Sequence, residues 1–194
     1  MEQLIDNLSE KIAGNISKDK EELEVITYGI HHIFMLLLNF FFVLVHGLIW
    51  NDLVFITVTF LHFSILRPYT GGYHAKTEGR CLCLSLVMIN LILICKRYFG
   101  VGAVWYLPLG LIAVVILILW SPVGTPNKEL DALEKAIYGR KARQIIAITV
   151  GVNSIAVLLG WNVLYAGITY SLVLSAGLLL AGKWKYKVIC TSVS

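Results

Sequence analysis

The stretch IFMLLLNFFFVLVHGLIWNDLVFITVTFLHFSIL, from Ile33 to Leu66, is almost continuously apolar and decides the fold. It is much longer than the roughly 20 residues that one membrane-spanning helix needs. The polar pair Asn51 and Asp52 interrupts it near the middle. The stretch therefore predicts two membrane-spanning helices joined by a tight turn at about 49–52.

The composition of the whole chain agrees with a membrane protein. Of the 194 residues, 58% are hydrophobic and 14% are charged, whereas soluble domains carry about 25% charged residues. A bilayer can solvate this much apolar side chain, because its interior is itself apolar. The net charge of +4 is modest and gives no reason to expect a nucleic-acid partner, and the 4 cysteines are too unevenly spaced for a disulfide framework.

Six apolar segments predict an all-α polytopic membrane protein that forms a single integral domain over residues 1–194. The expected spans cover about 30–48, 50–66, 81–95, 103–120, 144–160 and 163–182. Within the N-terminal segment 1–29, residues 1–13 have the spacing of an amphipathic helix lying on the membrane surface or on a partner, with a frayed tail as the alternative. Asn127 is the expected N-cap of a short surface helix that ends at Gly139, in the loop between spans four and five.

The distribution of basic residues predicts the orientation of the chain. Of the 16 lysines and arginines, all but Lys96 and Arg97 lie in the two termini or in the loops that precede spans three and five. The positive-inside rule places this side in the cytoplasm. We therefore expect a multi-pass protein of the cell membrane, with both termini and the loop between spans two and three at the cytoplasmic face.

That loop carries the residues on which any chemistry depends. It reads RPYTGGYHAKTEGR over residues 67–80, and Cys81 follows at the start of span three. A cysteine acts as a nucleophile through its thiolate, and the imidazole of His74 could take the proton. If Thr77 caps the next helix, the positive end of the helix dipole favours that thiolate, and backbone N–H groups of the first turn can hold an oxyanion. Arg80 adds a nearby positive charge.

Residue chemistry alone leaves the role of this loop open. Gly71 and Gly72 permit a turn that a side chain would block, which would bring His74 back over Cys81. The same residues also fit an interfacial loop with an inert cysteine. A zinc site that includes Cys83 is disfavoured, because residues two apart on a helix point about 200° apart. We expect no metal and no cofactor.

Four of these residues resemble the motif of a known family. Arg67, Gly72, His74 and Cys81 form the pattern R-x(4)-G-x-H-x(6)-C ahead of an apolar span, and this resembles the accessory gene regulator B (AgrB) family of bacterial membrane peptidases. The resemblance implies a thiol protease in the bacterial cell membrane with a Cys81–His74 catalytic dyad. It also implies that Arg67 and Gly72 are needed around the site.

The resemblance further implies a substrate, which is the quorum-sensing propeptide of the AgrD type. Cys81 would attack the bond before its acidic tail, and an internal Cys or Ser of the peptide would then close a thiolactone or lactone autoinducer. Lys76 and Arg80, with the basic loop between spans four and five, would attract the acidic tail, and Gly71 would support the turn. A homodimer is a further implication of the family.

A non-enzymatic reading of the same chain is a six-helix membrane transporter or scaffold. In that case Cys81 would be dispensable, and ionisable residues within the spans would matter instead. His62 is such a residue, and we expect it to be a neutral histidine that is hydrogen-bonded to a neighbouring helix.

Overall fold

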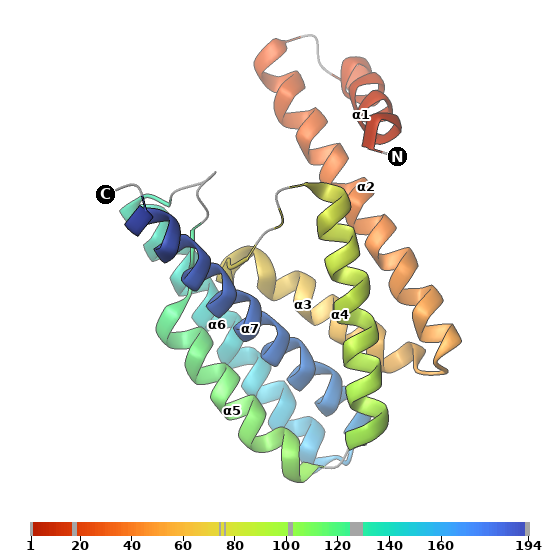
Figure 1. The fold of residues 1–194 in the computed structure, drawn as a ribbon, viewed down its shortest axis with the longest axis vertical. Coiled ribbons are helices and arrows are strands. Elements are labelled where there is room, and N and C mark those ends of the chain that lie inside the picture. Colours follow the sequence, from red (N-terminus) through yellow and green to blue (C-terminus); the bar gives the residue numbers. More distant parts are fainter. Residues whose placement is uncertain are drawn as a thin grey trace.

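The computed structural model of the chain describes residues 2–16, 19–73, 75, 77–100, 103–124 and 130–192. These residues form seven helices and no strand, which confirms the all-helical prediction (Figure 1). The helices are α1 (Glu2–Ile16), α2 (Lys20–Ile49), α3 (Leu53–Thr70), α4 (Glu78–Phe99), α5 (Ala103–Trp120), α6 (Ala132–Leu158) and α7 (Asn162–Ser192).

Five of the described helices, α2, α3, α4, α6 and α7, are long and apolar enough to cross a membrane, judged by length and composition. The sixth expected span, 103–120, corresponds to α5, whose apolar part Val104–Trp120 is shorter. At about 1.5 Å per residue it extends roughly 26 Å, slightly less than the roughly 30 Å hydrocarbon core. The chain is therefore a membrane-embedded helical protein, with five helices that meet the requirement for a span.

The surface helix expected from Asn127 to Gly139 is not a separate element. Asn127 lies outside the described residues, and α6 begins after Asp131, whose backbone N–H donates to the Glu134 carboxylate at 3.2 Å. The helix then continues without a break through Gly139 into the expected fifth span. An isolated glycine costs a helix only about 1 kcal/mol, and Gly139 is buried against Pro122, so the prediction of a helix end at this glycine was wrong.

Helix α3 also extends beyond its expected end and takes up the first four residues of the polar loop. The helix includes Pro68, which has no backbone N–H and therefore cannot donate to the Ser64 carbonyl. The Thr70 hydroxyl donates to the Leu66 carbonyl at 3.3 Å. Only residues 71–77 therefore connect α3 to α4, and the connection between the two helices is short.

Helix α7 lies at the centre of the helical bundle and contacts α3, α5 and α6, while α1 packs against α2 away from this bundle (Figure 1). The close approach of α7 to α3 depends on Gly167. A Cβ atom there would lie 3.0 Å from Val58 Cγ1 and 3.2 Å from the Phe55 carbonyl oxygen. Small residues at such crossings let membrane helices pack closely.

Hydrogen bonds between side chains connect α3, α6 and α7. The His62 Nδ1 lies 2.7 Å from the Ser171 hydroxyl, and its Nε2 lies 2.9 Å from the Thr149 hydroxyl. The Asn153 side chain donates to the Thr169 hydroxyl at 3.2 Å. The expectation that His62 is bonded to a neighbouring helix is confirmed, and it is bonded to two. Such bonds satisfy polar groups that have no water in the bilayer interior.

Candidate active site

The segment after α3 is anchored to α7 and to the loop after α5 by backbone hydrogen bonds. The Tyr73 N–H donates to the Leu178 carbonyl of α7 at 2.8 Å. The Val123 N–H donates to the Thr70 carbonyl at 3.0 Å, beside an isolated β-bridge between Val123 and Gly71. The start of the α3–α4 connection is therefore fixed against the bundle.

Three glycines allow this close contact. Gly71 and Gly72 have φ values of +68° and +117°, which confirms that they form a turn that other residues would adopt only with strain. A Cβ at Gly71 would lie 2.0 Å from the Val123 carbonyl oxygen. On the facing side, a Cβ at Gly182 of α7 would lie 2.5 Å from the Tyr73 nitrogen. The turn and α7 thus touch backbone to backbone.

Arg67 fixes the same turn through side-chain hydrogen bonds. Its half-buried guanidinium donates hydrogen bonds to the carbonyl oxygens of Gly71 and Tyr73. A guanidinium carries its donors in a rigid planar fork, so one side chain can fix two carbonyls at once. The position of the turn relative to α3 therefore depends on Arg67.

Cys81 lies in the first turn of α4. Thr77 is the N-cap, and its hydroxyl accepts a hydrogen bond from the Arg80 N–H at 3.4 Å, which confirms the predicted cap. The Cys81 N–H donates to the Thr77 carbonyl at 3.0 Å, the first backbone bond of the helix. The positive end of the helix dipole is thus close to the thiol, where it favours the thiolate.

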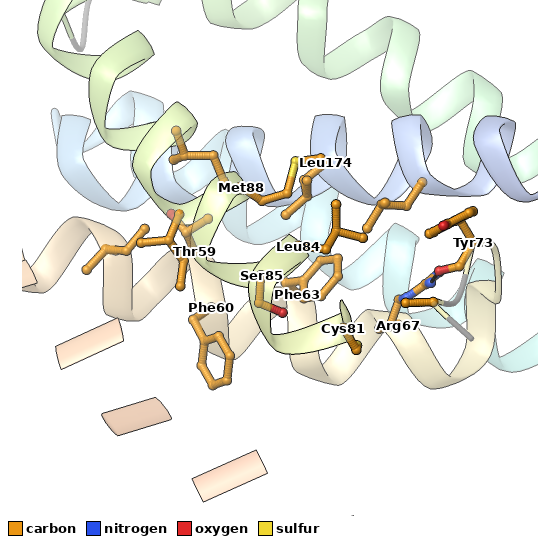
Figure 2. Close-up of a pocket in the computed structure, with 15 residues that line it drawn as sticks. Thr59, Phe60, Phe63, Arg67, Tyr73, Cys81, Leu84, Ser85, Met88 and Leu174 are labelled. Atoms are coloured by element: carbon orange, nitrogen blue, oxygen red, sulfur yellow. Dashed lines mark hydrogen bonds between the residues drawn. The ribbon is translucent and has the colours of Figure 1, made fainter. Parts of the chain in front are cut away.

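Arg67 and Cys81 line the same cavity, of about 180 Å³, between α3, α4 and α7. In Figure 2 their side chains lie at one end of the cavity, close to Tyr73, while Thr59 and Met88 lie farther along it. The positive charge of the guanidinium would stabilise a thiolate at Cys81. The rest of the lining is mostly apolar and includes Phe60, Phe63, Leu84, Met88, Leu174 and Leu178.

The predicted site residues divide into three groups. Arg67 and Cys81 are brought together at the cavity, and Gly71 and Gly72 form the turn above Arg67. Arg80 is exposed in the first turn of α4. His74 and Lys76 lie outside the described residues.

The described cysteines also bear on the question of a metal. Cys81 is half-buried at the cavity, whereas Cys83 is exposed and does not line it. Within the part of the chain that the structure describes, no three His, Cys, Asp or Glu side chains are grouped as a metal site would require. The divergence of Cys81 and Cys83 follows from the helical period.

Sequence reasoning missed two residues of the site, Tyr73 and Gly182. Tyr73 connects the turn to α7 through its backbone, and the Lys185 Nζ lies 4.3 Å from the centroid of its ring. Gly182 makes room for that contact. No feature of a single sequence distinguishes Gly182 from other small residues of α7 such as Gly177, because the contact depends on how the helices cross.

The helices and this site define a membrane-embedded protein with a cysteine at the start of a helix and an apolar cavity beside it. The family model described as accessory gene regulator B matches residues 3–184, which is nearly the whole chain. The chain belongs to the AgrB family. Membership implies involvement in the processing of agr quorum-sensing propeptides, since the family acts with an AgrD propeptide.

Curated relatives carry names that agree with this family. An AgrB-like protein 2 of Clostridium perfringens (strain 13 / Type A) is 25% identical over 171 residues, covering 82% of this chain and 80% of that protein. The accessory gene regulator protein B of Staphylococcus aureus (strain MW2) is 26% identical over 84 residues, covering 43% of this chain and 45% of that protein. No solved structure matches the chain.

Proposed function

We propose that the chain is a cysteine endopeptidase that removes the C-terminal tail of an AgrD-type propeptide, with Cys81 as the nucleophile and His74 as the general base. The observation that carries this proposal is the position of Cys81, in a capped first helical turn, facing an apolar cavity next to Arg67. His74 lies outside the described residues, so its role as general base rests on the sequence motif.

The first chemical step transfers the signal part of the propeptide to Cys81. The thiolate attacks the carbonyl carbon of the bond between signal and tail, with His74 having taken the thiol proton. A carbon–sulfur bond forms and the carbon–nitrogen bond breaks. The imidazolium of His74 then gives its proton to the leaving amine, and the tail departs.

The second step closes the ring of the signal peptide. An internal Cys thiol or Ser hydroxyl of the bound peptide gives its proton to His74 and attacks the thioester. The new thiolactone or lactone bond forms while the bond to Cys81 breaks, and Cys81 leaves as a thiolate. Hydrolysis of the thioester would prevent ring closure, so the site must exclude water. The apolar lining of the cavity supports such exclusion.

The proposal includes six spans with both termini and the 71–77 connection in the cytoplasm. The positive-inside rule supports this arrangement, because basic residues lie near the 71–77 connection, whereas Lys96 at the other end is paired with an acidic residue. At one end, Lys141 and Lys185 lie 5.6 Å and 4.3 Å from the ring centroids of Tyr69 and Tyr73. At the opposite end of α4 from Cys81, Lys96 pairs with the Asp52 carboxylate in the α2–α3 turn.

The basic end offers a binding surface for the acidic tail of the substrate. Lys141 and Lys185 lie beside the α3–α4 connection, and the exposed Arg80 follows it. Coulomb attraction of this kind is screened by salt, since the Debye length is about 8 Å at physiological ionic strength. Tail binding is therefore expected to weaken as salt is added. A homodimer is also part of the proposal, and crosslinking in membranes tests it.

The test is cleavage of an AgrD-type propeptide that is co-expressed with this chain in a bacterial membrane. Cys81→Ala and His74→Ala are each expected to abolish cleavage while the variant protein still inserts. Cys83→Ala is the matched control, because Cys83 lies on the same helix but is exposed and outside the cavity lining. Cleavage that survives both changes refutes the peptidase and favours the transporter or scaffold.

A further inference from the structure

The cavity continues along α4 well beyond the thiol. Cys81, Leu84, Met88 and Ile92 recur at helical spacing and all line it. From Cys81 to Ile92 this face rises roughly 16 Å at 1.5 Å per residue. A group attached to the Cys81 sulfur therefore has an apolar space directly beside it.

The lining restricts what can enter this space. Among the described lining residues the only charged one is Arg67, and its guanidinium already donates to the carbonyls of Gly71 and Tyr73. The Thr59 hydroxyl donates to the Phe55 carbonyl of its own helix. The rest of the lining offers a peptide backbone few partners, chiefly the Ser85 and Tyr73 hydroxyls and the other N–H groups of Arg67. Most polar groups of such a backbone would therefore be unpaired, at a cost of a few kcal/mol each. An apolar side chain has no such cost.

The volume of the cavity fits one large side chain. It measures about 180 Å³, and an apolar cavity of roughly 150 Å³ holds one benzene molecule. Phe60 and Phe63 contribute aromatic walls, and Met88 contributes a flexible thioether that adapts to different shapes. The cavity is partly open, so a lipid acyl chain is the competing occupant, and the experiment below distinguishes the two.

We propose that this cavity binds the side chain of the propeptide residue whose carbonyl Cys81 attacks, and that it selects a bulky apolar residue there. This inference rests on the proposed function. The thioester would hold that carbonyl at the Cys81 sulfur, on the wall of the cavity, so the side chain of the same residue is the part of the substrate that reaches inside. Discrimination against alanine is expected to be at least about tenfold.

The experiment compares propeptides that differ only at the residue before the cleaved bond, which is Ala, Leu or Phe. Initial cleavage rates are measured in membranes containing the full chain. The unmodified chain is expected to cleave the Leu and Phe forms at least about tenfold faster than the Ala form. Met88→Trp fills the cavity and is expected to reverse the preference toward Ala. Because the three rates are compared within one variant, a lower yield of folded protein changes all of them by the same factor and leaves the preference unchanged.

Val87→Trp is the matched control, since Val87 is adjacent to Met88 but 61% exposed and outside the lining. It is expected to keep the preference of the unmodified chain. Equal rates for the three propeptides, or equal preferences in both Trp variants, overturn the inference even when Cys81→Ala abolishes cleavage. Cleavage by Cys81→Ala refutes the proposed function instead. Native mass spectrometry tests for a bound phospholipid. If Met88→Trp alone loses that phospholipid and its preference among the three propeptides is unchanged, the cavity binds lipid and the inference is overturned.

Discussion

Arg67, in the last turns of α3, and Cys81, in the first turn of α4, line the same end of one cavity. The Arg67 guanidinium would stabilise a thiolate at Cys81, and it donates to the carbonyls of Gly71 and Tyr73. One side chain thus connects the turn after α3 to the proposed nucleophile. The arrangement assigns Arg67 a positioning role, which substitution can test.

Replacing Arg67 by lysine keeps the positive charge but removes the planar fork that reaches two carbonyls. We expect Arg67→Lys to lower the rate of propeptide cleavage roughly 100-fold, the cost of a misplaced reacting group. Arg97→Lys, at the exposed far end of α4, is the control and should have no effect. Full activity of Arg67→Lys at equal membrane abundance would show that charge alone matters.

Gly182 is expected to tolerate no side chain. In Gly182→Ala the new Cβ would lie 2.5 Å from the Tyr73 nitrogen, so the turn must move away from α7. Cleavage should fall by roughly tenfold or more as the site loses its geometry. Gly177→Ala on the same helix is the control, because in the described part of the chain no atom outside its own helix backbone lies within 4 Å of its Cβ position. Equal activities of the two variants would contradict the backbone contact.

His62 is expected to contribute to stability. In His62→Leu the bonds to the Ser171 and Thr149 hydroxyls are lost, and we expect the free energy of unfolding in detergent micelles to fall by about 1 kcal/mol. His32→Leu, at an exposed position of α2, serves as the control. Cleavage by folded His62→Leu should persist. Loss of function without loss of stability would favour a transporter that uses His62.

The thiol of Cys81 is expected to react faster with iodoacetamide at pH 7 than that of Cys83, each measured in a variant that keeps only that cysteine. Accessibility alone predicts the reverse order, because Cys83 is exposed and Cys81 is half-buried. The difference should vanish in denaturant, where the capped helix and its dipole are absent. A faster Cys83 in the folded protein would contradict activation of Cys81.

The sequence predicts the local features of this protein well. The long apolar segments are all helical, and the Thr77 cap and the turn at Gly71 and Gly72 occur as expected. These features depend on neighbouring residues, so composition and spacing are enough to find them. The prediction of a helix end at Gly139 was wrong, because burial of this glycine against a distant segment outweighs its weak local tendency to end a helix.

The parts of the site that depend on tertiary packing could not be predicted. Hydropathy identifies Phe63 and Met88 only as span residues, and it does not separate a side chain that faces a cavity from one that faces lipid. The contact of Gly182 with Tyr73 and the pairing of His62 with two helices depend on how α7 crosses α3. The role of Cys81 was inferred from a family motif, and its catalytic part stays a prediction.

Mass spectrometry of a trapped intermediate gives the clearest evidence of whether Cys81 carries the signal peptide as a thioester. A propeptide whose internal Cys or Ser is replaced by Ala cannot close the ring, so the acyl-enzyme should accumulate. We expect an adduct on the Cys81 peptide that hydroxylamine removes and that is absent from Cys81→Ala. Release of the tail with no adduct on Cys81, or an adduct on another residue, would contradict a thioester at Cys81.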